Sequence, residues 1–371
     1  MNILVFSWRD LKHPLAGGAE QVMHEHMKSW VAAGHKVTLF SSYFSGAKRE
    51  EVVDGVETLR KGCQLGGVHI AAFFWYVFKN HKKYDLVVDQ FHGIPFFTPL
   101  YVRKPKLAVL QEVAKDVWFL NDFSFPLNLV IGFLGYISEP IIFLLYRNVD
   151  FMVGSNSAKE DLIKMGIPSL KITIVPHGVI IKYPKPFPPK EKIKTVMFLG
   201  ALAKDKGVED AIKVFSLLNK KRECNFWIVG RGGESYVSKL LSMCKELGLD
   251  NKVKFWGFVD DKNKFELLAR AHLMINPSAR EGWGLVNIEA NSVGIPVVAY
   301  SSPGLIDSVK NGKSGILVKE NLPEKLAKAI IEILDNKERY RHLQTGALAW
   351  SKNFSWEKSK QESLRLINKV V

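Results

Sequence analysis

Short apolar runs alternate with longer segments of helical periodicity from one end of this chain to the other. Because strands that alternate with helices build parallel sheets from βαβ units, the alternation predicts an α/β fold. One of the helical segments covers about Ala19–Ala33. The expected strands are Ile3–Phe6, Val37–Ser41, Leu86–Asp89, Leu107–Leu110, Met152–Gly154, Ile172–Val175, Val196–Leu199, Phe226–Val229, Val253–Trp256, Leu273–Asn276 and Pro296–Ala299.

The chain has 371 residues, more than one ordinary hydrophobic core serves. Four prolines crowd Lys182–Lys190, which excludes a helix or a central strand there and predicts a linker. We therefore expect two Rossmann-like doubly wound domains that face each other across a cleft. In such sheets ligands bind outside the carboxyl ends of the strands. The expected parts are a first domain at 1–181, a proline-rich linker at 182–194, a second domain at 195–350 and a C-terminal helix at 351–371.

The net charge of +15 is unevenly distributed, with 19 Lys and Arg against 16 Asp and Glu in residues 1–180 and 33 against 21 in residues 181–371. A basic second half suits an anionic ligand or an anionic membrane surface, or serves only as a solubilising surface. No basic-aromatic string, zinc finger or basic heptad accompanies the charge, so no nucleic-acid partner is expected. Cys63, Cys224 and Cys244 are too few for a disulfide framework. With an N-terminus that lacks a basic leader, they predict a cytoplasmic location.

One long apolar stretch, Phe123–Tyr146, does not follow the alternation. Its charged side chain is Glu139, and Pro140 comes directly after it. The stretch is long enough to span a bilayer. However, a central glutamate opposes insertion by about 2.5–3.5 kcal/mol, and a crossing would separate two halves of one sheet. Three alternatives stay open: a spanning helix, a packed helix pair, and a surface that touches the membrane. A second apolar run, Val68–Phe78, lies in the same domain.

The segment Asn276–Val298 carries the strongest functional signal. A strand ends in Asn-Pro-Ser, a turn containing Gly282 and Gly284 follows, and a helix is expected to begin near Gly284. Free amides at the start of a helix bind anions, and glycines let a ligand approach the backbone. Glu281 precedes the helix and Glu289 lies inside it, about 10 Å further along the axis. Carboxylates at that spacing suit two anchors on an extended ligand with phosphates between them, such as a nucleotide sugar.

This segment, with two glutamates eight positions apart before Ala-Asn-x-x-Gly-x-Pro-Val-Val, resembles the signature of family 4 retaining glycosyltransferases of the GT-B fold. The resemblance covers nearly the whole chain. It implies that the first domain binds the acceptor, the second binds a nucleotide diphosphate sugar, and the C-terminal helix packs back on the first domain. Further matching segments occur in the family's order at Val5–Phe6, His13–Glu20, Asn156–Leu162, Ile174–Val179, Phe198–Gly207 and Phe354–Trp356.

The resemblance also implies roles for individual residues. Glu289 would hold the ribose hydroxyls of the donor, and Glu281 would hold the transferred sugar. Lys206 would neutralise the diphosphate and stabilise the leaving nucleoside diphosphate, so Glu281 and Lys206 are the expected catalytic residues. No metal and no other cofactor is expected, because the chain lacks an Asp-x-Asp motif. The backbone would meet the donor at Gly17 and Gly18 of the first domain and at Gly282, Trp283, Gly284, Leu285 and Val286 of the second.

Two positions depart from the family pattern. Ala201 stands where an arginine usually follows the glycine of the donor-domain turn, and Lys204 is a candidate substitute. Gln111, followed by Glu112, stands where many members have a histidine near the reacting sugar. Glutamine can hydrogen-bond a sugar hydroxyl but cannot shuttle a proton. Since the departing phosphate is thought to act as the base in this family, activity is still expected.

The histidines receive simpler interpretations. We expect His177 to serve the turn in which it lies, and His13 to face the cleft, where it can reach the donor or the acceptor. His24 and His26 are expected on the surface of the first helix.

The leading hypothesis is a retaining glycosyltransferase that moves a hexose from a nucleotide diphosphate sugar to a hydroxyl acceptor, either soluble or lipid-linked. With a lipid-linked acceptor, the enzyme would be peripheral at the cytoplasmic face of a membrane. The alternatives are a nucleotide-sugar epimerase of the same fold, and a non-catalytic GT-B partner subunit suggested by Ala201 and Gln111. A dinucleotide-dependent dehydrogenase is a weaker hypothesis, because Gly230–Glu234 lacks the required glycine spacing.

Overall fold

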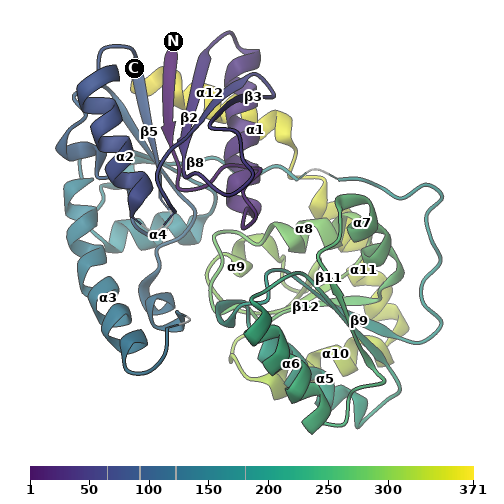
Figure 1. The fold of residues 1–371 in the computed structure, drawn as a ribbon. Coiled ribbons are helices and arrows are strands. Elements are labelled where there is room, and N and C mark those ends of the chain that lie inside the picture. Colours follow the sequence, from purple (N-terminus) through teal and green to yellow (C-terminus); the bar gives the residue numbers. More distant parts are fainter. Residues whose placement is uncertain (65, 92, 122, 180) are drawn as a thin grey trace. The chain divides into compact units, whose positions relative to one another are not determined.

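The computed structural model describes residues 1–64, 66–91, 93–121, 123–179 and 181–371. By its internal contacts the chain divides into two compact units. Each unit contains a parallel or largely parallel sheet with helices packed against it (Figure 1), which confirms the predicted α/β class. The first unit consists of Met1–Trp118, Phe133–Gly178 and Ser355–Val371, and the second of Phe119–Gly132 and Val179–Phe354.

Among the described residues, the first unit holds an eight-stranded sheet in the order β3-β4-β2-β1-β5-β6-β7-β8. The central strand β1 pairs in parallel with β2 and β5, and its four residues Ile3–Phe6 are fully buried. A strand covered on both faces must be apolar on both, which explains this continuous apolar run. The strands are β1 Asn2–Phe6, β2 Lys36–Ser41, β3 Glu50–Val53, β4 Val56–Arg60, β5 Leu86–Phe91, β6 Lys106–Leu110, β7 Asp150–Val153 and β8 Ile172–Ile174.

Helices pack against this first sheet. The core next to α1 contains Met23, Met27 and Trp30 of that helix, all buried against β1, β2 and β5. The α-helices are α1 Gly18–Ala32, α2 Gly67–Trp75, α3 Leu127–Leu145 (which belongs to this unit from Phe133 onward), α4 Asn156–Lys164 and α12 Trp356–Val370. The helix α2 continues as a π-helix, and three short 3-10 turns lie between strands, giving η1 Tyr76–Asn80, η2 Thr98–Leu100, η3 Lys115–Leu120 and η4 Ser169–Lys171.

The last helix, α12, belongs to the first unit although it follows the second in sequence. Figure 1 shows it in yellow among the purple and blue elements. Its residues Leu366 and Ile367 are buried in the core beside α1. The indole Nε1 of Trp30 also donates a hydrogen bond of 2.8 Å to Ser363 Oγ. The part of the chain that joins the first unit begins at Ser355, four residues after the expected boundary, because the preceding helix continues to Ser351.

The second unit contains a parallel six-stranded sheet in the order β11-β10-β9-β12-β13-β14. Its strands are β9 Thr195–Leu199, β10 Asn225–Val229, β11 Val253–Gly257, β12 Leu273–Asn276, β13 Val297–Tyr300 and β14 Gly315–Val318. The amphipathic helices α5 and α10 bury their apolar faces against this sheet, with Phe215 and Ile330 fully buried. The helices are η5 Lys204–Lys206, α5 Val208–Asn219, α6 Glu234–Glu246, α7 Asp261–Arg270, α8 Leu285–Ser292, α9 Leu305–Ser308, α10 Pro323–Asp335 and α11 Lys337–Ser351.

The apolar stretch forms a single helix, α3, so the alternative of a packed helix pair is wrong. Within the described residues, α3 is the helix that is long and apolar enough to cross a membrane by length and composition, and 22% of its apolar window is buried. Glu139 is buried, and its carboxylate accepts hydrogen bonds from the backbone amides of Ala114 (2.7 Å) and Lys115 (2.8 Å). The strands on either side of α3, β6 and β7, pair with each other. A single crossing would separate these strands, so the structure does not favour a spanning helix. The helix is anchored near its C-terminal end, where Phe143 packs against Phe91 and Phe151 of the sheet.

Candidate active site

Loops that follow neighbouring strands of the second sheet interlock at its carboxyl edge. The amide of Gly200, after β9, donates to the carbonyl of Val229 (3.0 Å), and the amide of Gly230, after β10, donates to Gly257 (2.9 Å). A Cβ on Gly230 would lie 1.7 Å from the Gly200 carbonyl oxygen, so a side chain there is sterically excluded. These contacts hold the loops close together at the carboxyl edge of the sheet, where α/β proteins bind ligands.

The helix α8 begins at this same edge. Its N-cap, Gly284, adopts the left-handed conformation (φ +85°) that favours glycine. A buried chain of amide and hydroxyl groups holds the beginning of the helix in place. Asn276 at the end of β12 donates to Asn287 (2.9 Å), and Asn287 donates to Ser308 (2.8 Å). The helix therefore presents its first amides from a rigid position, which suits an anionic ligand.

Two loops at the edge are joined through Ser278. Its hydroxyl donates to the carbonyl of Asp205 (3.1 Å), which also accepts from the amide of Ala279 (2.9 Å). Beside them, a Cβ on Gly207 would lie 2.1 Å from the carbonyl oxygen of Pro277, at a φ of +70°. The loop after β9 and the loop after β12 therefore have one fixed relative position.

This arrangement brings the two expected catalytic residues together. The ammonium Nζ of Lys206 lies 3.1 Å from Oε2 of Glu281 and 3.2 Å from Oδ2 of Asp205. The side chains of Lys206 and Glu281 are 22% and 20% exposed. The pair is thus reachable from solvent, and a ligand with stronger negative charge can compete for the ammonium. Sequence spacing did not predict the direct contact, since 75 positions separate the two residues.

A third loop supports Glu281 and was missed in the sequence. The backbone amide of Glu281 donates to the carbonyl of Pro303 (3.1 Å). A Cβ on Gly304 would lie 2.0 Å from the carbonyl oxygen of Glu281, at a φ of +80°. The Ser-Ser-Pro-Gly turn directly after β13 is the signal that could have identified this loop.

Glu289 lies within α8 and is buried. Its Oε1 is 2.7 Å from Nζ of Lys264 on α7. The same ammonium lies 3.1 Å from Oδ1 of Asp261, and Lys182 of the linker lies 2.9 Å from Oδ2 of Asp261. Burial lowers the pKa of Lys264, but the adjacent Glu289 and Asp261 carboxylates outweigh it and raise that pKa above its ordinary value.

The remaining residues of the turn contribute backbone and packing. The Trp283 ring is buried, 4.8 Å from the Phe354 ring in an edge-on arrangement, and it packs with Val179 and Ile288. Its side chain is therefore turned into the core, which leaves its backbone as the part able to meet a ligand. Leu285 and Val286 are partly buried in α8.

The glycine loop of the first unit leads directly into α1. Gly17 is the N-cap of that helix, Gly18 is its first residue, and the amide of Gly17 donates to Oε2 of Glu20 (2.7 Å). Glu20 also accepts from Arg9 (3.1 Å), and His13 accepts from the amide of Leu15 (3.1 Å). This loop at the carboxyl end of β1 is therefore ordered by its own contacts.

Comparison with known proteins identifies the family. Residues 179–350 match the family described as Glycosyl transferases group 1, and residues 16–183 match Glycosyltransferase Family 4. The chain is a family 4 glycosyltransferase. It is 26% identical over 322 residues to an uncharacterized glycosyltransferase of Methanocaldococcus jannaschii, covering 80% of this chain and 79% of the relative.

Solved structures agree on the fold. The glycosyltransferase superposes on sucrose-phosphate synthase from Thermosynechococcus elongatus with a TM-score of 0.82 at 20% identity, covering 100% of this chain and 98% of the other. Anabaena HepE, solved in complex with UDP-glucose, gives a TM-score of 0.75 at 19% identity over the full length of both chains. The two α/β units are therefore those of the GT-B fold.

In this glycosyltransferase, the side chain of Gln111 is held by a histidine. Gln111 lies directly after β6, and its Oε1 is 2.9 Å from Nε2 of His177. Burial lowers the pKa of His177 to about 4, so its imidazole is neutral at pH 7 and donates to Gln111. His177 is therefore a side-chain partner of Gln111, and the interpretation as a simple turn residue was incomplete. A Cβ on Gly154 would lie 2.2 Å from His177 Nε2, so the adjacent glycine makes room for the imidazole.

Two other expectations for histidines are wrong. His24 and His26 were expected on the surface of α1, but both are buried. The His26 ring packs 5.7 Å from the Trp356 ring of the C-terminal segment, and His24 Nε2 lies 2.9 Å from Asp54. Neither contact can be read from the periodicity of α1 alone.

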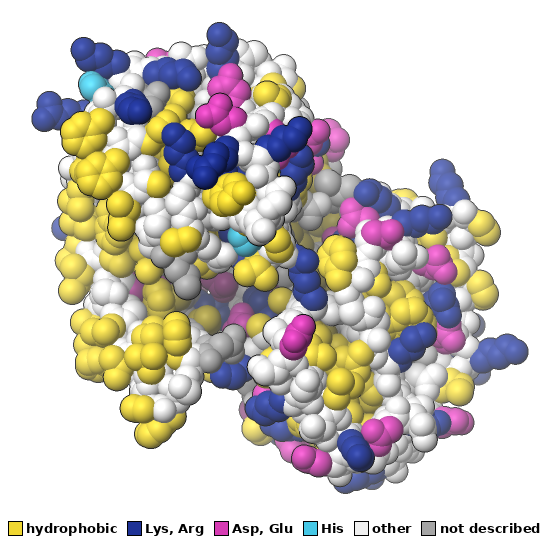
Figure 2. All heavy atoms as spheres, in the orientation of Figure 1, with side chains coloured by type: hydrophobic (Ala, Val, Ile, Leu, Met, Phe, Trp, Pro, Cys, Tyr) yellow, Lys and Arg dark blue, Asp and Glu magenta, His cyan; other side chains and the backbone are white. Residues whose placement is uncertain are grey.

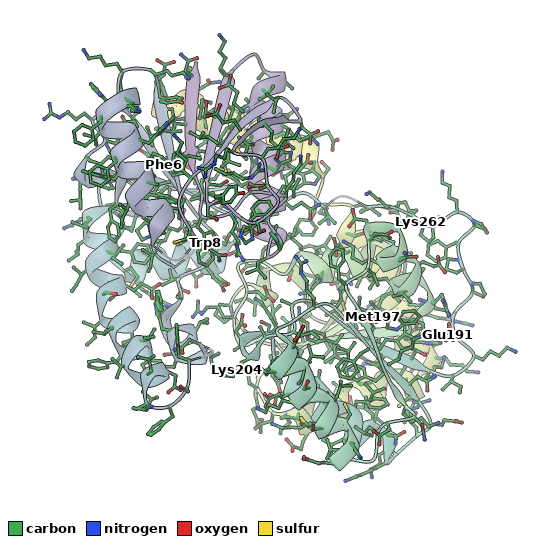
Figure 3. The ribbon with its side chains drawn as sticks, in the orientation of Figure 1. Phe6, Trp8, Glu191, Met197, Lys204 and Lys262 are labelled. Carbon is green, nitrogen blue, oxygen red and sulfur yellow. The ribbon has the colours of Figure 1, made fainter. Side chains whose placement is uncertain are left out.

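Ala201 stands where the family resemblance leads us to expect an arginine, and Lys204 is the expected substitute three positions later. Ala201 and Lys204 are both exposed, and Figure 3 labels Lys204 at the start of η5. Across the residues that the structure describes, no group of three or more His, Cys, Asp or Glu side chains is arranged to hold a metal ion.

Proposed function

We propose that this glycosyltransferase moves a hexose from a nucleotide diphosphate sugar to a hydroxyl acceptor with retention of anomeric configuration. The observation that carries the proposal is the contact between Lys206 and Glu281, 3.1 Å apart beside the start of α8. The diphosphate of a donor is more strongly charged than one carboxylate and competes for the ammonium. Donor binding then moves Lys206 to the diphosphate and leaves Glu281 to accept hydrogen bonds from the sugar.

The chemistry follows from where negative charge develops. As the bond between the sugar and the phosphate breaks, charge builds on the leaving diphosphate, and Lys206 with the first amides of α8 stabilises it. The oxygen of the acceptor hydroxyl bonds to the anomeric carbon from the face that the diphosphate leaves, and the leaving phosphate oxygen takes the hydroxyl proton, so the anomeric configuration is retained. No protein base is needed for this step, and Gln111 cannot supply one. Glu289 holds the ribose hydroxyls, and the amides of the Gly282–Val286 turn meet the sugar and the diphosphate.

A donor panel tests this proposal. The protein is incubated with UDP-glucose, UDP-galactose and GDP-mannose, its melting temperature is measured, and the products are identified by mass spectrometry. A bound donor raises stability by RT ln(1 + [L]/Kd). We expect one donor to raise the melting temperature and to be transferred or slowly hydrolysed. Because no metal is expected in the site, EDTA should not change this result. UDP-glucose is tested first because HepE is described with it. A sugar changed in configuration indicates an epimerase, and binding without turnover indicates a non-catalytic subunit.

We propose further that the acceptor is lipid-linked and that the protein is peripheral at the cytoplasmic face of a membrane. Figure 2 shows hydrophobic side chains gathered over α2 and α3. On α3, Phe133 and Leu134 are 58% and 62% exposed, and near α2, Phe74 and Phe78 are 53% and 71% exposed. Apolar surface of this extent marks an interaction site. Exposed basic residues follow η1 and would attract anionic headgroups, namely Lys82 and Lys83.

Flotation with anionic liposomes tests the membrane proposal. We expect the wild type to float at low ionic strength and to be released in part by high salt. A variant with Phe133→Ser and Leu134→Ser should lose flotation. The matched control changes two similarly exposed residues of the second unit, Leu241→Ser and Leu348→Ser, and should float like the wild type. If the wild type stays at the bottom of the gradient, a soluble acceptor is the better interpretation.

A further inference from the structure

The proposed ribose-binding carboxylate, Glu289, is one member of a buried ion pair. Glu289 projects from α8 and Lys264 from the neighbouring α7, with Oε1 and Nζ 2.7 Å apart. The two side chains are only 10% and 15% exposed. Removing one partner of a buried pair leaves the other charge uncompensated, which is strongly unfavourable. Lys264 therefore compensates the charge of Glu289 and orients its carboxylate.

The pair is the innermost part of a network of side chains with alternating charges. Lys264 Nζ lies 3.1 Å from Asp261 Oδ1, and Asp261 Oδ2 lies 2.9 Å from Lys182 Nζ. The side chains of this network become more exposed outward, from 10% at Glu289 to 55% at Lys182. Asp261 is the first residue of α7, and Lys182 is the first residue of the expected proline-rich linker. The charged network thus connects the carboxylate of Glu289 in α8 to the start of α7 and to the linker.

We propose that Lys264 is a positioning residue that prepares Glu289 to bind the ribose of the donor. The proposal rests on the function proposed above, in which Glu289 accepts hydrogen bonds from the ribose hydroxyls. A carboxylate offers about four acceptor positions, so one bond from Lys264 leaves the others available to a diol. The donor is anionic, and the positive charge of Lys264 cancels the repulsion that an unpaired Glu289 would exert on the diphosphate. Lys264 thereby lowers the Kd for the nucleotide without touching the reacting sugar.

The predicted effect is on binding rather than on turnover. Lys264→Met should raise the KM for the donor and the Kd for UDP by about tenfold or more, while kcat changes much less. Lys264→Arg keeps the charge and should restore most of the affinity. Asp261→Asn weakens the next contact outward and should have an intermediate effect. The matched control is Lys262→Met on the same helix, where Lys262 is exposed (Figure 3).

Calorimetric titration with UDP and steady-state kinetics with the accepted nucleotide sugar test this inference, with circular dichroism to verify folding of each variant. The expected result is a raised KM and Kd for Lys264→Met, rescue by Lys264→Arg, and wild-type values for Lys262→Met. If Glu289→Ala loses affinity while folded Lys264→Met binds like the wild type, the positioning role is overturned and the proposed function survives. If Glu289→Ala also binds like the wild type, the ribose role of Glu289 and this inference fail together.

Discussion

Among the described residues, the carboxylates of Glu281 and Asp205 lie beside Lys206, the residue whose charge the proposed chemistry most requires. We expect Lys206→Ala to lower kcat/KM by about a hundredfold or more, as for the loss of one group that stabilises a transition state. Lys204→Ala, two residues away and exposed, should have a smaller effect. Steady-state kinetics compare the two variants. Equal losses would show that both lysines bind the diphosphate, and an unaffected Lys206→Ala would exclude the electrostatic mechanism.

The two glutamates of the site should differ in their kinetic effects. Glu289→Ala is expected to raise the Kd for the nucleotide, because its carboxylate is proposed to bind the ribose. Glu281→Ala should mainly lower kcat, because its carboxylate is proposed to bind the transferred sugar. The loss of a charged hydrogen bond to a ligand corresponds to about 1.5–3 kcal/mol. UDP titration and initial rates separate the two effects, and wild-type behaviour of both variants would refute the site assignment.

How much of the site the sequence predicts depends on whether its residues are close along the chain. The turn Glu281–Val286 and Glu289 share one segment, so their order along a loop and a helix could be read directly. Lys264 was not identified, because its contact with Glu289 arises from the packing of α7 on α8. Gly304 was also missed, since a glycine required by a distant carbonyl group looks like any turn glycine.

Among the elements, α3 shows how one polar side chain can fix an apolar helix. Glu139 accepts hydrogen bonds from the amides of Ala114 and Lys115, in the loop after β6. Glu139→Ala leaves two backbone donors without this acceptor and should lower the free energy of unfolding by about 2–4 kcal/mol. Glu160→Ala on α4, an exposed glutamate, is the control and should have little effect. Urea denaturation measures both variants, and equal stabilities would contradict the anchoring role.

The strands that the sequence analysis missed are the edge strands β3 and β14 and the strand β4, which pairs with β3. The hairpin β3–β4 has exposed glutamates and lacks the apolar runs of central strands. Its turn, Asp54-Gly55 with positive φ at both residues, is the typical hairpin signal and could have revealed it. The edge strand β14 is short and only partly buried, so its pattern is weak. Central strands such as β1 and β12 were found because burial on both faces makes them continuously apolar.

For the whole molecule, buried histidines predict how stability depends on pH. Burial lowers the pKa of His26 to about 3 and of His177 and His272 to about 4. In the unfolded chain these groups titrate near pH 6.5. Below that pH the unfolded state therefore binds more protons than the folded state. The contribution of these histidines to the free energy of unfolding is complete above about pH 6.5 and is lost as the pH falls toward 4.

We expect the melting temperature to fall between pH 6.5 and 4, with each buried histidine contributing up to about 1.4 kcal/mol per pH unit. His26→Phe, which keeps an aromatic ring beside Trp356, should make this dependence shallower. His342→Gln, at an exposed position, should not. Calorimetric melting of the three proteins across the pH range provides the comparison. If His26→Phe leaves the dependence of melting temperature on pH unchanged, the lowered pKa of His26 is not a cause of that dependence.

The return of α12 to the first unit also has a consequence for synthesis on the ribosome. The core beside α1 is incomplete until Leu366 and Ile367 of α12 have been translated. Everything between Gly178 and Ser355 has to be made in the meantime, which takes on the order of 10–35 s at roughly 5–20 residues per second. The second unit, whose main segment is continuous, can complete its fold before the first. The first unit is therefore the later of the two to finish folding, and chains that stop before α12 expose its uncovered core to chaperones and proteases.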